Sequence, residues 1–592
     1  MRSRSFGTGR PTLREAFPKL FRDEHAQNEQ QAIPETADTS HDEPAVYHDE
    51  RAILRTSVLG IPDWKEWEFS YATIALNILV TLLSLDLVFR GPLLYDGKSL
   101  TFSRLGFIDD KSAKILFRDP NPANLPIYAY LKPLASSAWS RVDTIYRLSD
   151  DTDYTYPIVL SELQPGTEYD YALSNDLRGT FKTAPPRNSL AAKSLTFLTT
   201  SCIKANFPYS PFAHSLSIAG LKHMSRVLRS MTSPASFMMF LGDFIYVDVP
   251  LRLSSSPEHY RAEYRRVYAS PSWDLPGVNL PWLHTLDDHE IANDWAGGNE
   301  TEPFQAASDP FVNYHVSVNP PFPPKVTPAE EPNTTYFQFT QGPASFFMMD
   351  TRRYRTNSEV PAGKLSDNTK PLYGSSSSPA QYRDYGPSML GPTQLQALLS
   401  FLTTPEPLNV HWKFIASSVP FTKNWQFGTS DTWGGFLEER KRILDAMQYA
   451  EANLGVRIVI LSGDRHEFAA VRFPPTANHT ASAGGQSDST TQGPHEFSVG
   501  PLSMFYLPFR TFKQTDKEDV ALAYVPDGNS KLGSIEIVPR KADAAGAVRS
   551  HLTYTLWVDG VNKWQYTLTS PPSAIRASSN IDTWKVFGSR HG

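Results

Sequence analysis

The most hydrophobic part of the chain is one run from Ala72 to Phe89, which reads ATIALNILVTLLSLDLVF. A run of this length is at the short end of what crosses a bilayer as a helix. Asn77 lies inside the run, and Asp86 lies near its end, where the cost of an acidic side chain in a membrane falls. The pattern predicts a single transmembrane helix over residues 72–89, and its alternative is a helix buried in, or docked on, a soluble protein.

The segments at the two ends of the chain are polar. Residues 1–70 show little apolar periodicity, which predicts a disordered N-terminal tail. Arg2, Arg4 and Arg10 are not followed by an apolar core, so this is not an ordinary cleavable signal peptide. An arginine-rich tail favours the cytoplasmic side. We therefore expect a single-pass membrane protein whose remaining domains are lumenal or extracellular, with residues 571–592 as a C-terminal tail.

Short alternating runs follow between residues 93 and 185, separated by Pro, Asn, Asp and Gly. Such spacing is typical of a small all-β sandwich, as in immunoglobulin-like or fibronectin III-like domains. The turn Leu163–Tyr169 resembles the one before a late fibronectin III strand. The expected strands are Leu100–Phe107, Ala113–Phe117, Ile127–Leu131, Tyr154–Leu160, Tyr169–Leu173 and Gly179–Thr183.

From about residue 194 the pattern changes to apolar runs alternating with helical stretches, which predicts an α/β or layered α/β/β/α architecture. Residues 533–568 return to strand-like alternation and are expected to complete a sheet edge. Two long polar loops interrupt the pattern, at 355–392 and 474–495. The expected strands are Leu195–Thr199, Phe237–Leu241, Leu283–Leu286, Phe346–Met349, Lys413–Ala416 and Val456–Leu461, and the expected helices are Leu216–Met231, Glu258–Ala269, Thr393–Phe401 and Leu437–Leu454.

Composition narrows the function classes. The chain has 592 residues, is 40% hydrophobic, and carries a formal net charge of -6. No large basic field is available, so nucleic acid is not expected as a main partner. Cys202 is the only cysteine, so no intramolecular disulfide can form. A lone cysteine is usually a small buried hydrophobe, but this one lies among other residues that can do chemistry.

Polar side chains follow four of the predicted strands where each strand ends. The four segments are Ser201-Cys202, Gly242 to Tyr246, Asp287 to Asp294 and Ser462 to His466. Ligand sites in α/β sheets lie outside the carboxyl ends of the strands. Each segment alone has a structural explanation as a turn or a helix cap, but together they predict one site.

The residue types indicate a metal-dependent hydrolase. Two or more cations can neutralise phosphoryl oxygens and activate water. Asp243 and Asp464 can bind hard cations, and Asn293 offers a neutral oxygen. The thiolate of Cys202 and the phenolate of Tyr246 favour a softer or more highly charged transition metal, so a mixed cluster is expected.

These motifs together resemble the alkaline phosphatase D (PhoD-like) family of metallophosphoesterases. The resemblance rests on Ser-Cys, Gly-Asp-x-x-Tyr, Asp-Asp-His-Glu-x-x-Asn and Ser-Gly-Asp-x-His, with weaker likeness at residues 350–355, 391–395 and 431–436. It covers about residues 195–505. It departs at Asp294, where the family often has Asn, and at Phe436, where Tyr is usual.

The resemblance implies a PhoD-like metallophosphatase domain over residues 194–570, with a calcineurin-like four-layer α/β/β/α fold and Fe³⁺ and Ca²⁺ as cofactors. The fold class is then α+β, with the sandwich before the catalytic domain. By resemblance, the metal ligands are Cys202, Asp243, Tyr246, Asn293 and Asp464, with Asp288 and Glu290 as further candidates. Arg352 matches a residue expected to meet the phosphate, and His289 and His466 match residues that contact phosphate or protonate the leaving group.

The expected activity is hydrolysis of phosphate monoesters or diesters by metal-activated hydroxide, without a covalent enzyme intermediate. The partners are a phosphate ester substrate and, through residues 72–89, a membrane. One alternative is a phospholipase D-like phosphodiesterase, which a membrane anchor would suit. The other is a membrane-tethered binding protein with a degenerate site, which the full set of ligand types argues against.

Overall fold

A computed structural model describes residues 50–63, 67–321, 334–356, 387–407, 409–476, 493–540 and 549–571, and the chain divides into two units, residues 1–90 and 91–592. The predicted loops at 355–392 and 474–495 lie largely outside the described residues, as do residues 1–49 of the predicted N-terminal tail and nearly all of the C-terminal tail.

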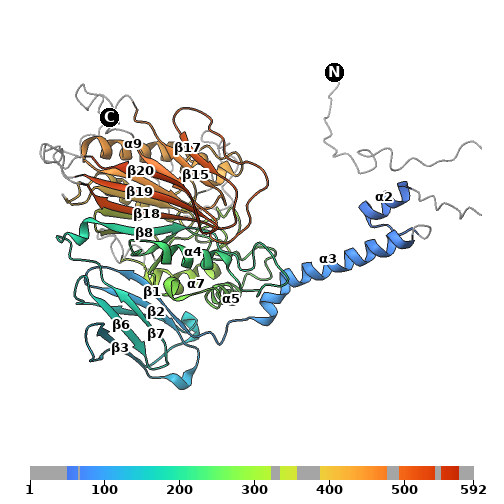
Figure 1. The fold of residues 1–592 in the computed structure, drawn as a ribbon, viewed down its shortest axis with the longest axis horizontal. Helices are drawn as coiled ribbons and strands as arrows, with labels where there is room; N and C mark the ends of the chain where they lie inside the picture. Colours follow the sequence, from blue (N-terminus) through green and yellow to red (C-terminus); the bar gives the residue numbers. More distant parts are fainter. Residues whose placement is uncertain are drawn as a thin grey trace, which may run out of the picture. The chain divides into compact units, whose positions relative to one another are not determined.

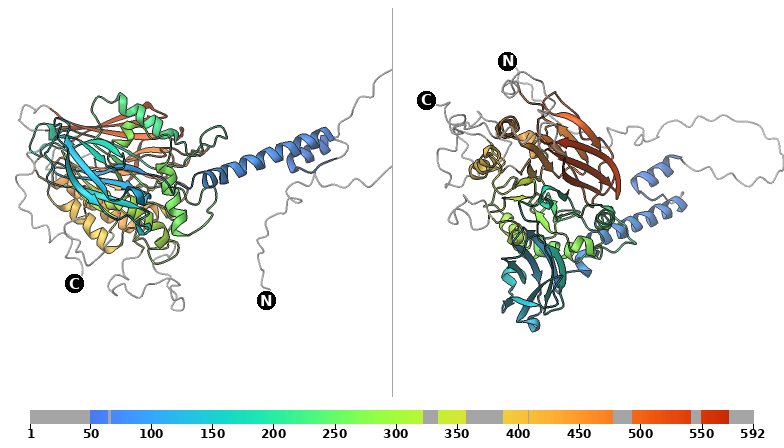
Figure 2. Two further views of the ribbon diagram at one scale, coloured as in Figure 1. Left: turned by 90° about the horizontal axis from the view of Figure 1, so that it is seen from below. Right: turned by 60° about the vertical axis from the view of Figure 1, so that its left-hand side comes forward.

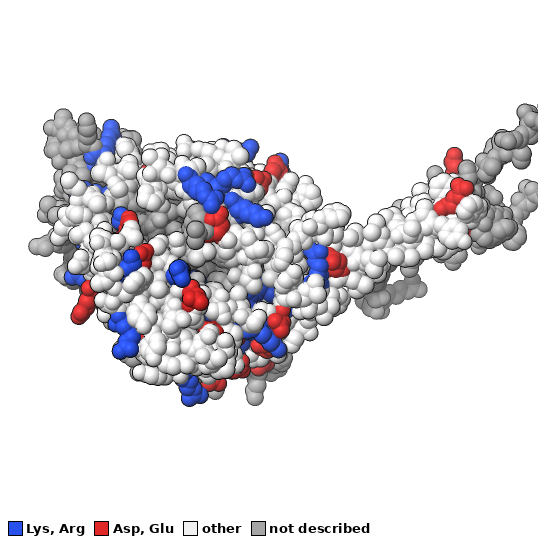
Figure 3. All heavy atoms as spheres, turned by 60° about the horizontal axis from the view of Figure 1, so that its bottom comes forward, with Lys and Arg blue, Asp and Glu red and all other residues white. Residues whose placement is uncertain are grey.

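The first unit contains a short helix and most of a long one. Helix α2 (Glu50–Leu59) corrects the prediction that all of residues 1–70 lack structure, and α3 (Trp67–Leu94) begins before the apolar run. α3 is long and apolar enough to cross a membrane. Figure 3 shows its surface without charged side chains between the ends.

Two hydroxyl side chains in the apolar part of α3 are hydrogen-bonded within the helix itself. The hydroxyls of Thr81 and Ser84 donate to the carbonyls of Asn77 and Val80, four residues earlier. Satisfying polar groups inside the helix lowers the cost of an apolar environment. Asp86, at the end of the apolar run, pairs with Arg90 at 3.6 Å.

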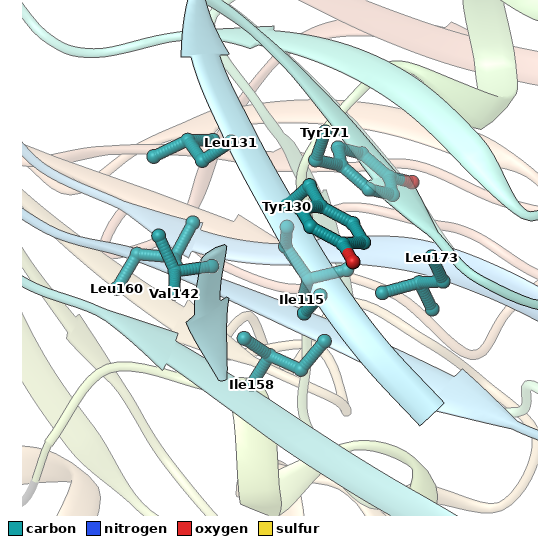
Figure 4. A pocket seen from close by; sticks show the side chains of 9 residues that line it. Ile115, Tyr130, Leu131, Val142, Ile158, Leu160, Tyr171 and Leu173 are labelled. Atoms are coloured by element: carbon teal, nitrogen blue, oxygen red, sulfur yellow. The ribbon is translucent and has the colours of Figure 1, made fainter. Parts of the chain in front are cut away.

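The second unit begins with two antiparallel sheets that share one core. The first sheet has the order β1-β2-β5 and the second β4-β3-β6-β7. Their inward side chains form a common apolar cluster, and Figure 4 shows the small apolar pocket between the sheets. The strands are β1 (Phe102–Ile108), β2 (Ala113–Arg118), β3 (Ile127–Pro133), β4 (Ser140–Ile145), β5 (Thr155–Leu160), β6 (Glu168–Leu173) and β7 (Arg178–Lys182).

β4 is the one strand here that the sequence did not predict. Its first three residues are exposed, and only Ile145 is buried, so it lacks the alternation that marks the other strands. It forms through pairing with β3 rather than through a buried face of its own.

The rest of the second unit is built on two larger sheets. The six-stranded sheet has the order β10-β9-β8-β18-β19-β20, and the seven-stranded sheet has the order β11-β12-β13-β14-β16-β15-β17. Strands β18, β19 and β20 make up half of the first sheet, with β20 at its edge, as residues 533–568 predict. The strands are β8 (Leu195–Thr200), β9 (Met238–Phe240), β10 (Trp282–His284), β11 (Phe337–Gln341), β12 (Ala344–Met348), β13 (Trp412–Ser417), β14 (Arg457–Ser462), β15 (Phe468–Arg472), β16 (His495–Ser498), β17 (Val520–Val525), β18 (Lys531–Pro539), β19 (Ser550–Val558) and β20 (Val561–Thr569).

Side-chain alternation explains why these strands read as continuous apolar runs. In β8, Phe197 joins the cluster shared by the two sheets, while Leu198 joins the cluster with the helices. In β14, Val459 faces the shared cluster, while Ile458 faces helices on the other side. Strands covered on both faces need apolar side chains at every position.

Helices lie on the outer face of each sheet, over β8 to β10 of the six-stranded sheet and over β12 to β14 of the seven-stranded sheet (Figures 1 and 2). Residues of α4, α5 and α7 share a cluster with the six-stranded sheet, and residues of α8 and α9 share one with the seven-stranded sheet. The helices are α4 (Ala219–Ser230), α5 (Pro257–Tyr268), α6 (Leu275–Val278), α7 (Phe304–Tyr314), α8 (Gly391–Thr403) and α9 (Leu437–Asn453), and the short 3-10 turns are η1 (Pro122–Asn124), η2 (Asp150–Thr152), η3 (Ala191–Lys193), η4 (Val316–Val318), η6 (Thr429–Asp431) and η7 (Trp433–Gly435).

A buried ionic network joins the small sheets to α5 and α7. The carboxylate of Asp153 accepts hydrogen bonds from Arg118, from Arg265 of α5 and from the Tyr314 hydroxyl of α7. Because one carboxylate serves two buried guanidinium groups, each of the three elements depends on the others for its charge balance.

Candidate metal centre

The four chemistry-bearing segments meet where their strands end, as the sequence predicts. β8, β9 and β10 are parallel neighbours, so the residues that follow them emerge at one sheet edge. Cys202 N–H donates to the carbonyl of Gly242, which ties the first two segments together. The segment after β14 arrives from the other sheet, where Cys202 Sγ lies 3.8 Å from the carbonyl oxygen of Asp464.

The backbone of this site is held in an unusual conformation. Cys202, Asp243, Asp294, Asp464 and His466 all have positive φ, between 52° and 76°. Side chains other than Gly, Asn and Asp rarely adopt this left-handed region. Such strain persists only where surrounding contacts over-determine the backbone, and it clusters at functional sites.

The first group that could hold a metal ion is Cys202, Asp243 and His466, with one ligand atom each within 4.8 Å of the others. Cys202 Sγ lies 3.3 Å from Asp243 Oδ2. The Tyr246 hydroxyl joins the group, because it donates to Asp243 Oδ2 at 2.8 Å and lies 2.7 Å from His466 Nε2. A thiol, a phenol, a carboxyl and an imidazole therefore converge on one point.

Two further groups continue from the first. Asp243, Asp288 and His289 form the second, and Asp288, Asp294 and Asp431 form the third. The first two share Asp243, and the last two share Asp288. A shared carboxylate is what a bridged pair of cations requires, because its two oxygens can each take one ion.

The donor set fits metal ions better than it fits a metal-free core. Burial is the first cause that raises the pKa of Cys202, Tyr246 and Asp243 well above their usual values, and neighbouring acids raise them further. Acidic groups enclosed together in this way cannot all ionise without a compensating positive charge. Asp287 Oδ2 is also buried with no hydrogen-bond partner in the described ranges. A bound cation would satisfy both conditions.

The two predicted histidines lie in different environments. Burial lowers the pKa of His466 to about 3, so its imidazole is neutral and can offer a lone pair. Burial also acts to lower the pKa of His289, but Asp288, Asp243 and Asp248 outweigh it and raise that pKa well above the usual value. The His289 ring packs against the Tyr246 ring, with centroids 4.1 Å apart and the two planes tilted by 32°.

Asp248 is a site residue that sequence reasoning missed. Its Oδ1 lies 2.6 Å from His289 Nδ1, and its Oδ2 accepts from the Asn293 N–H at 2.6 Å. It therefore joins the segment after β9 to the segment after β10. The available signal was its position two residues after Tyr246, on the turn that carries Asp243.

Arg352, which is expected to meet the phosphate, is enclosed by carboxylates in this structure. Its side chain is fully buried, Nε donates to Asp287 at 2.6 Å, and both Nη atoms donate to Asp431, at 2.7 and 2.8 Å. Its planar fork is thus filled by carboxylates, and a phosphate could reach it only if Asp431 moved away.

Glu290, a further candidate ligand, accepts hydrogen bonds from backbone N–H groups in this structure. Its Oε2 accepts from the N–H groups of Asp243 and Asp287, and its Oε1 accepts from the N–H of Phe244. Both carboxylate oxygens are therefore used to hold the turns after β9 and β10 together.

Two other predicted ligands lie at the border of the site. The carboxylate of Asp464 pairs with Arg465 at 2.9 Å and lies outside the three groups, although burial raises its pKa to about 6. The side chain of Asn293 is exposed. The structure thus brings Cys202, Asp243, Tyr246, Asp288, His289 and His466 together, and it places Asp464 and Asn293 beside them.

Comparisons with known proteins find a family, a curated relative and solved structures that are similar to this chain. The family described as PhoD-like phosphatase matches residues 197–536. "Alkaline phosphatase D" of Bacillus subtilis (strain 168) is 26% identical over 337 residues, which cover 51% of this chain and 52% of that protein, so the chain spans about half the length of this relative. A solved structure titled "Structure of PhoD" covers 78% of this chain and 91% of that chain, with a TM-score of 0.53 and 16% identity, and it supports the fold alone.

The shared carboxylate predicts how metal is lost from variants. Asp243→Asn removes a charged ligand from two groups, whereas Cys202→Ala removes a ligand from one. We expect Asp243→Asn to lose metal from both groups, and Cys202→Ala to lose it mainly from the first, each with affinity reduced at least about tenfold. Metal per chain after gel filtration, measured by mass spectrometry, checks this. The control is Glu168→Gln, which removes a carboxylate from an exposed ion pair. Full metal content in Asp243→Asn would contradict the assignment.

Proposed function

This chain belongs to the PhoD-like phosphatase family, and we propose that it hydrolyses phosphate esters with metal ions held by the Asp243 cluster. The observation that carries the proposal is the pair of ligand groups that share Asp243, with a thiol, a phenol, a carboxyl and imidazoles around it. Hydrolysis of a phosphate ester requires neutralisation of the phosphoryl oxygens, and a bound pair of cations supplies this together with activated water.

The chemistry of the donors supports Fe³⁺ and Ca²⁺ as the cations. Thiolate, phenolate and imidazole ligands suit a transition metal, which favours iron at Cys202, Tyr246, Asp243 and His466. The third group offers only the carboxylates of Asp288, Asp294 and Asp431, and hard oxygen donors suit calcium. In this proposal Asn293 and Asp464, beside the groups, complete the ligand sets.

His289 is the proposed proton donor to the leaving group, so in this proposal the carboxylates of Asp243 and Asp288 hold the cation of the second group. Its Nδ1 is fixed by Asp248, so the ring orientation is set, and the proton on the opposite nitrogen can be given to the departing oxygen. His466 lies against Tyr246 and is proposed to bind metal or the phosphate rather than to donate a proton.

Arg352 is proposed to act through its carboxylate partners. It binds Asp431 of the third group and lies 3.6 Å from Asp288, which belongs to the second and third groups. A buried cation beside these carboxylates keeps them ionised and fixes their direction. It is therefore a positioning residue for the oxygen ligands.

For the architecture, we propose a calcineurin-like α/β/β/α catalytic domain over residues 194–570. The helices on the outer faces of two sheets with a common core support this. The two small sheets between residues 93 and 185 are proposed to form an immunoglobulin-like sandwich, supported by their antiparallel order and single shared core.

The helix α3 is proposed to span a membrane, with the N-terminal tail in the cytoplasm and the catalytic domain lumenal or extracellular. Its length, its apolar surface and the internal hydrogen bonds of Thr81 and Ser84 support the span. The arginines near the N-terminus support the orientation.

Activity is expected to depend on Asp243. With p-nitrophenyl phosphate and bis-p-nitrophenyl phosphate as substrates, Asp243→Asn should lower kcat/KM by about a hundredfold or more, since each 1.4 kcal/mol of lost stabilisation is tenfold in rate. The control variant Glu168→Gln makes the same change from carboxylate to amide in the small sheets, and it should keep wild-type turnover. Turnover of Asp243→Asn near the wild-type rate would show that the cluster is not the catalytic centre.

Asp248→Asn should lower kcat/KM by about 10- to 100-fold, which is the usual cost of removing a partner that orients a site residue. The amide keeps the size of the side chain but loses the charge that holds His289. Steady-state kinetics and metal content are measured together. A lower kcat/KM with the metal retained supports the role of Asp248 in positioning His289. A kcat/KM equal to that of the wild type would contradict this role.

The anchor proposal predicts that the full chain stays with membranes after alkaline carbonate extraction. Replacing Leu79 and Leu82 with Lys places two charges in the apolar stretch, at a cost of about 2.5–3.5 kcal/mol each at a helix centre, and should release the protein to the soluble fraction. Release of the wild-type chain by carbonate would exclude a spanning helix.

A further inference from the structure

An apolar layer lies directly against the candidate metal centre. Met504 forms a buried cluster with Cys202 and Tyr246, and the partly buried side chains of Phe207 and Val249 pack against it. These residues come from three different loops. One side of the candidate metal centre is therefore lined by apolar side chains rather than by solvent or charged groups.

Phe505 extends this layer towards the surface. Its ring lies 5.9 Å from the His466 imidazole, edge to face, and 6.4 Å from the ring of Phe207. Although it contacts a site residue, the Phe505 side chain is 41% exposed.

The position of Phe505 is fixed by main-chain hydrogen bonds. Leu502 N–H donates to the Ser201 carbonyl at 2.6 Å, and Ser503 N–H donates to the Cys202 carbonyl at 3.1 Å. The segment before Phe505 is thus held alongside the segment that supplies the thiol. The exposed ring is therefore displayed beside the metal centre by a fixed support.

An exposed aromatic pair joins Phe509, four residues after Phe505, to Phe427 from the loop after β13. Phe427 and Phe509 are 54% and 48% exposed, and their ring centroids are 5.4 Å apart. Gly428, next to Phe427, accepts a hydrogen bond from Arg465, the neighbour of Asp464. Phe505 and this pair are here called the aromatic rim.

Exposed aromatic side chains next to a cluster of acids and imidazoles have a cost in water. Each side chain leaves apolar surface in contact with water, and covering that surface would be favourable by about 25 cal/mol per Å². Binding sites that combine a few polar groups with an apolar wall typically bind ligands that have a polar part and an apolar part. The polar half of this site is the Asp243 cluster, which takes the phosphoryl group in the function proposed above.

We propose that the aromatic rim binds the apolar alkyl or aryl group of the phosphate ester whose phosphorus lies at the Asp243 cluster. The substrate class is then an amphiphilic phosphate ester rather than a small, fully polar one. This inference rests on the proposed function, since the rim has a role in specificity only if the cluster is catalytic.

The test uses the full-length metal-loaded protein in detergent and a series of alkyl 4-nitrophenyl phosphates with ethyl, butyl, hexyl and octyl groups. The detergent and all ester concentrations are kept constant, and the esters stay below the concentration at which they aggregate or enter micelles. We expect kcat/KM to rise about twofold to fourfold for each methylene that reaches the rim.

Phe505→Ala should reduce this chain-length dependence, and Phe505→Leu, which restores an apolar side chain, should recover part of it. The ratio of octyl to ethyl kcat/KM is compared within each variant, so a general loss of activity does not enter it. Tyr146→Ala, which removes an exposed aromatic side chain from the small sheets, should keep the wild-type ratio.

The outcomes separate the two proposals. No turnover of any ester by the metal-loaded wild type, in this series or as a monoester, would overturn the proposed function. Turnover with no dependence on chain length, or an unchanged ratio in Phe505→Ala, would overturn the rim while leaving the hydrolase. If longer esters are preferred only above the concentration at which they aggregate, the aromatic rim binds the surface of the aggregate. That result would overturn the proposal that it binds a single ester molecule.

Discussion

Several acids that are enclosed together away from water set the conditions for the whole site. Cys202, Tyr246 and Asp243 lie within hydrogen-bonding distance in a buried space, and burial opposes the ionisation of each one. Isolated, they would have to stay protonated. The surrounding structure provides converging ligand atoms and shared carboxylates, which a bound cation would neutralise. A buried guanidinium keeps the neighbouring acids oriented. The apolar layer of Met504, Phe207 and Val249 excludes water from one side, which strengthens every charge interaction inside.

The fold delivers these groups by a simple rule. Parallel strands β8, β9 and β10 end at a common edge, and β14 of the second sheet ends opposite them. Because each strand is covered on both faces, its side chains are committed to the core, and chemistry is confined to the turn that follows. Glu290 and Asp248 then link neighbouring turns, one through backbone N–H groups and one through His289. The turns are held to each other as well as to their strands.

Sequence patterns predicted most of this arrangement and failed at identifiable points. The apolar runs placed the strands before Cys202, Asp243, Asp288 and Asp464, because a strand buried on both faces leaves a clear pattern. β4 was missed because its pairing, rather than a buried face, makes it a strand. Asp248 was missed although it lies two residues after Tyr246, and the carboxylate partners of Arg352 could not be found, since they depend on contacts between segments far apart in the chain. The immunoglobulin-like and calcineurin-like assignments and the metal identities remain predictions.

The left-handed backbone at Cys202 and His466 has a consequence for how this protein tolerates change. Glycine adopts such a conformation without steric cost, so Cys202→Gly or His466→Gly relieves strain of the order of 1 kcal/mol, while it also removes a buried acid or imidazole. The loss of the side chain opposes that gain, because it leaves a cavity beside Tyr246 and Met504 at Cys202 and removes a hydrogen-bond partner of the Tyr246 hydroxyl at His466. The strained backbone at these two positions is therefore tied to the side chains that they carry, and a stabilised version of this protein should be sought by changes elsewhere.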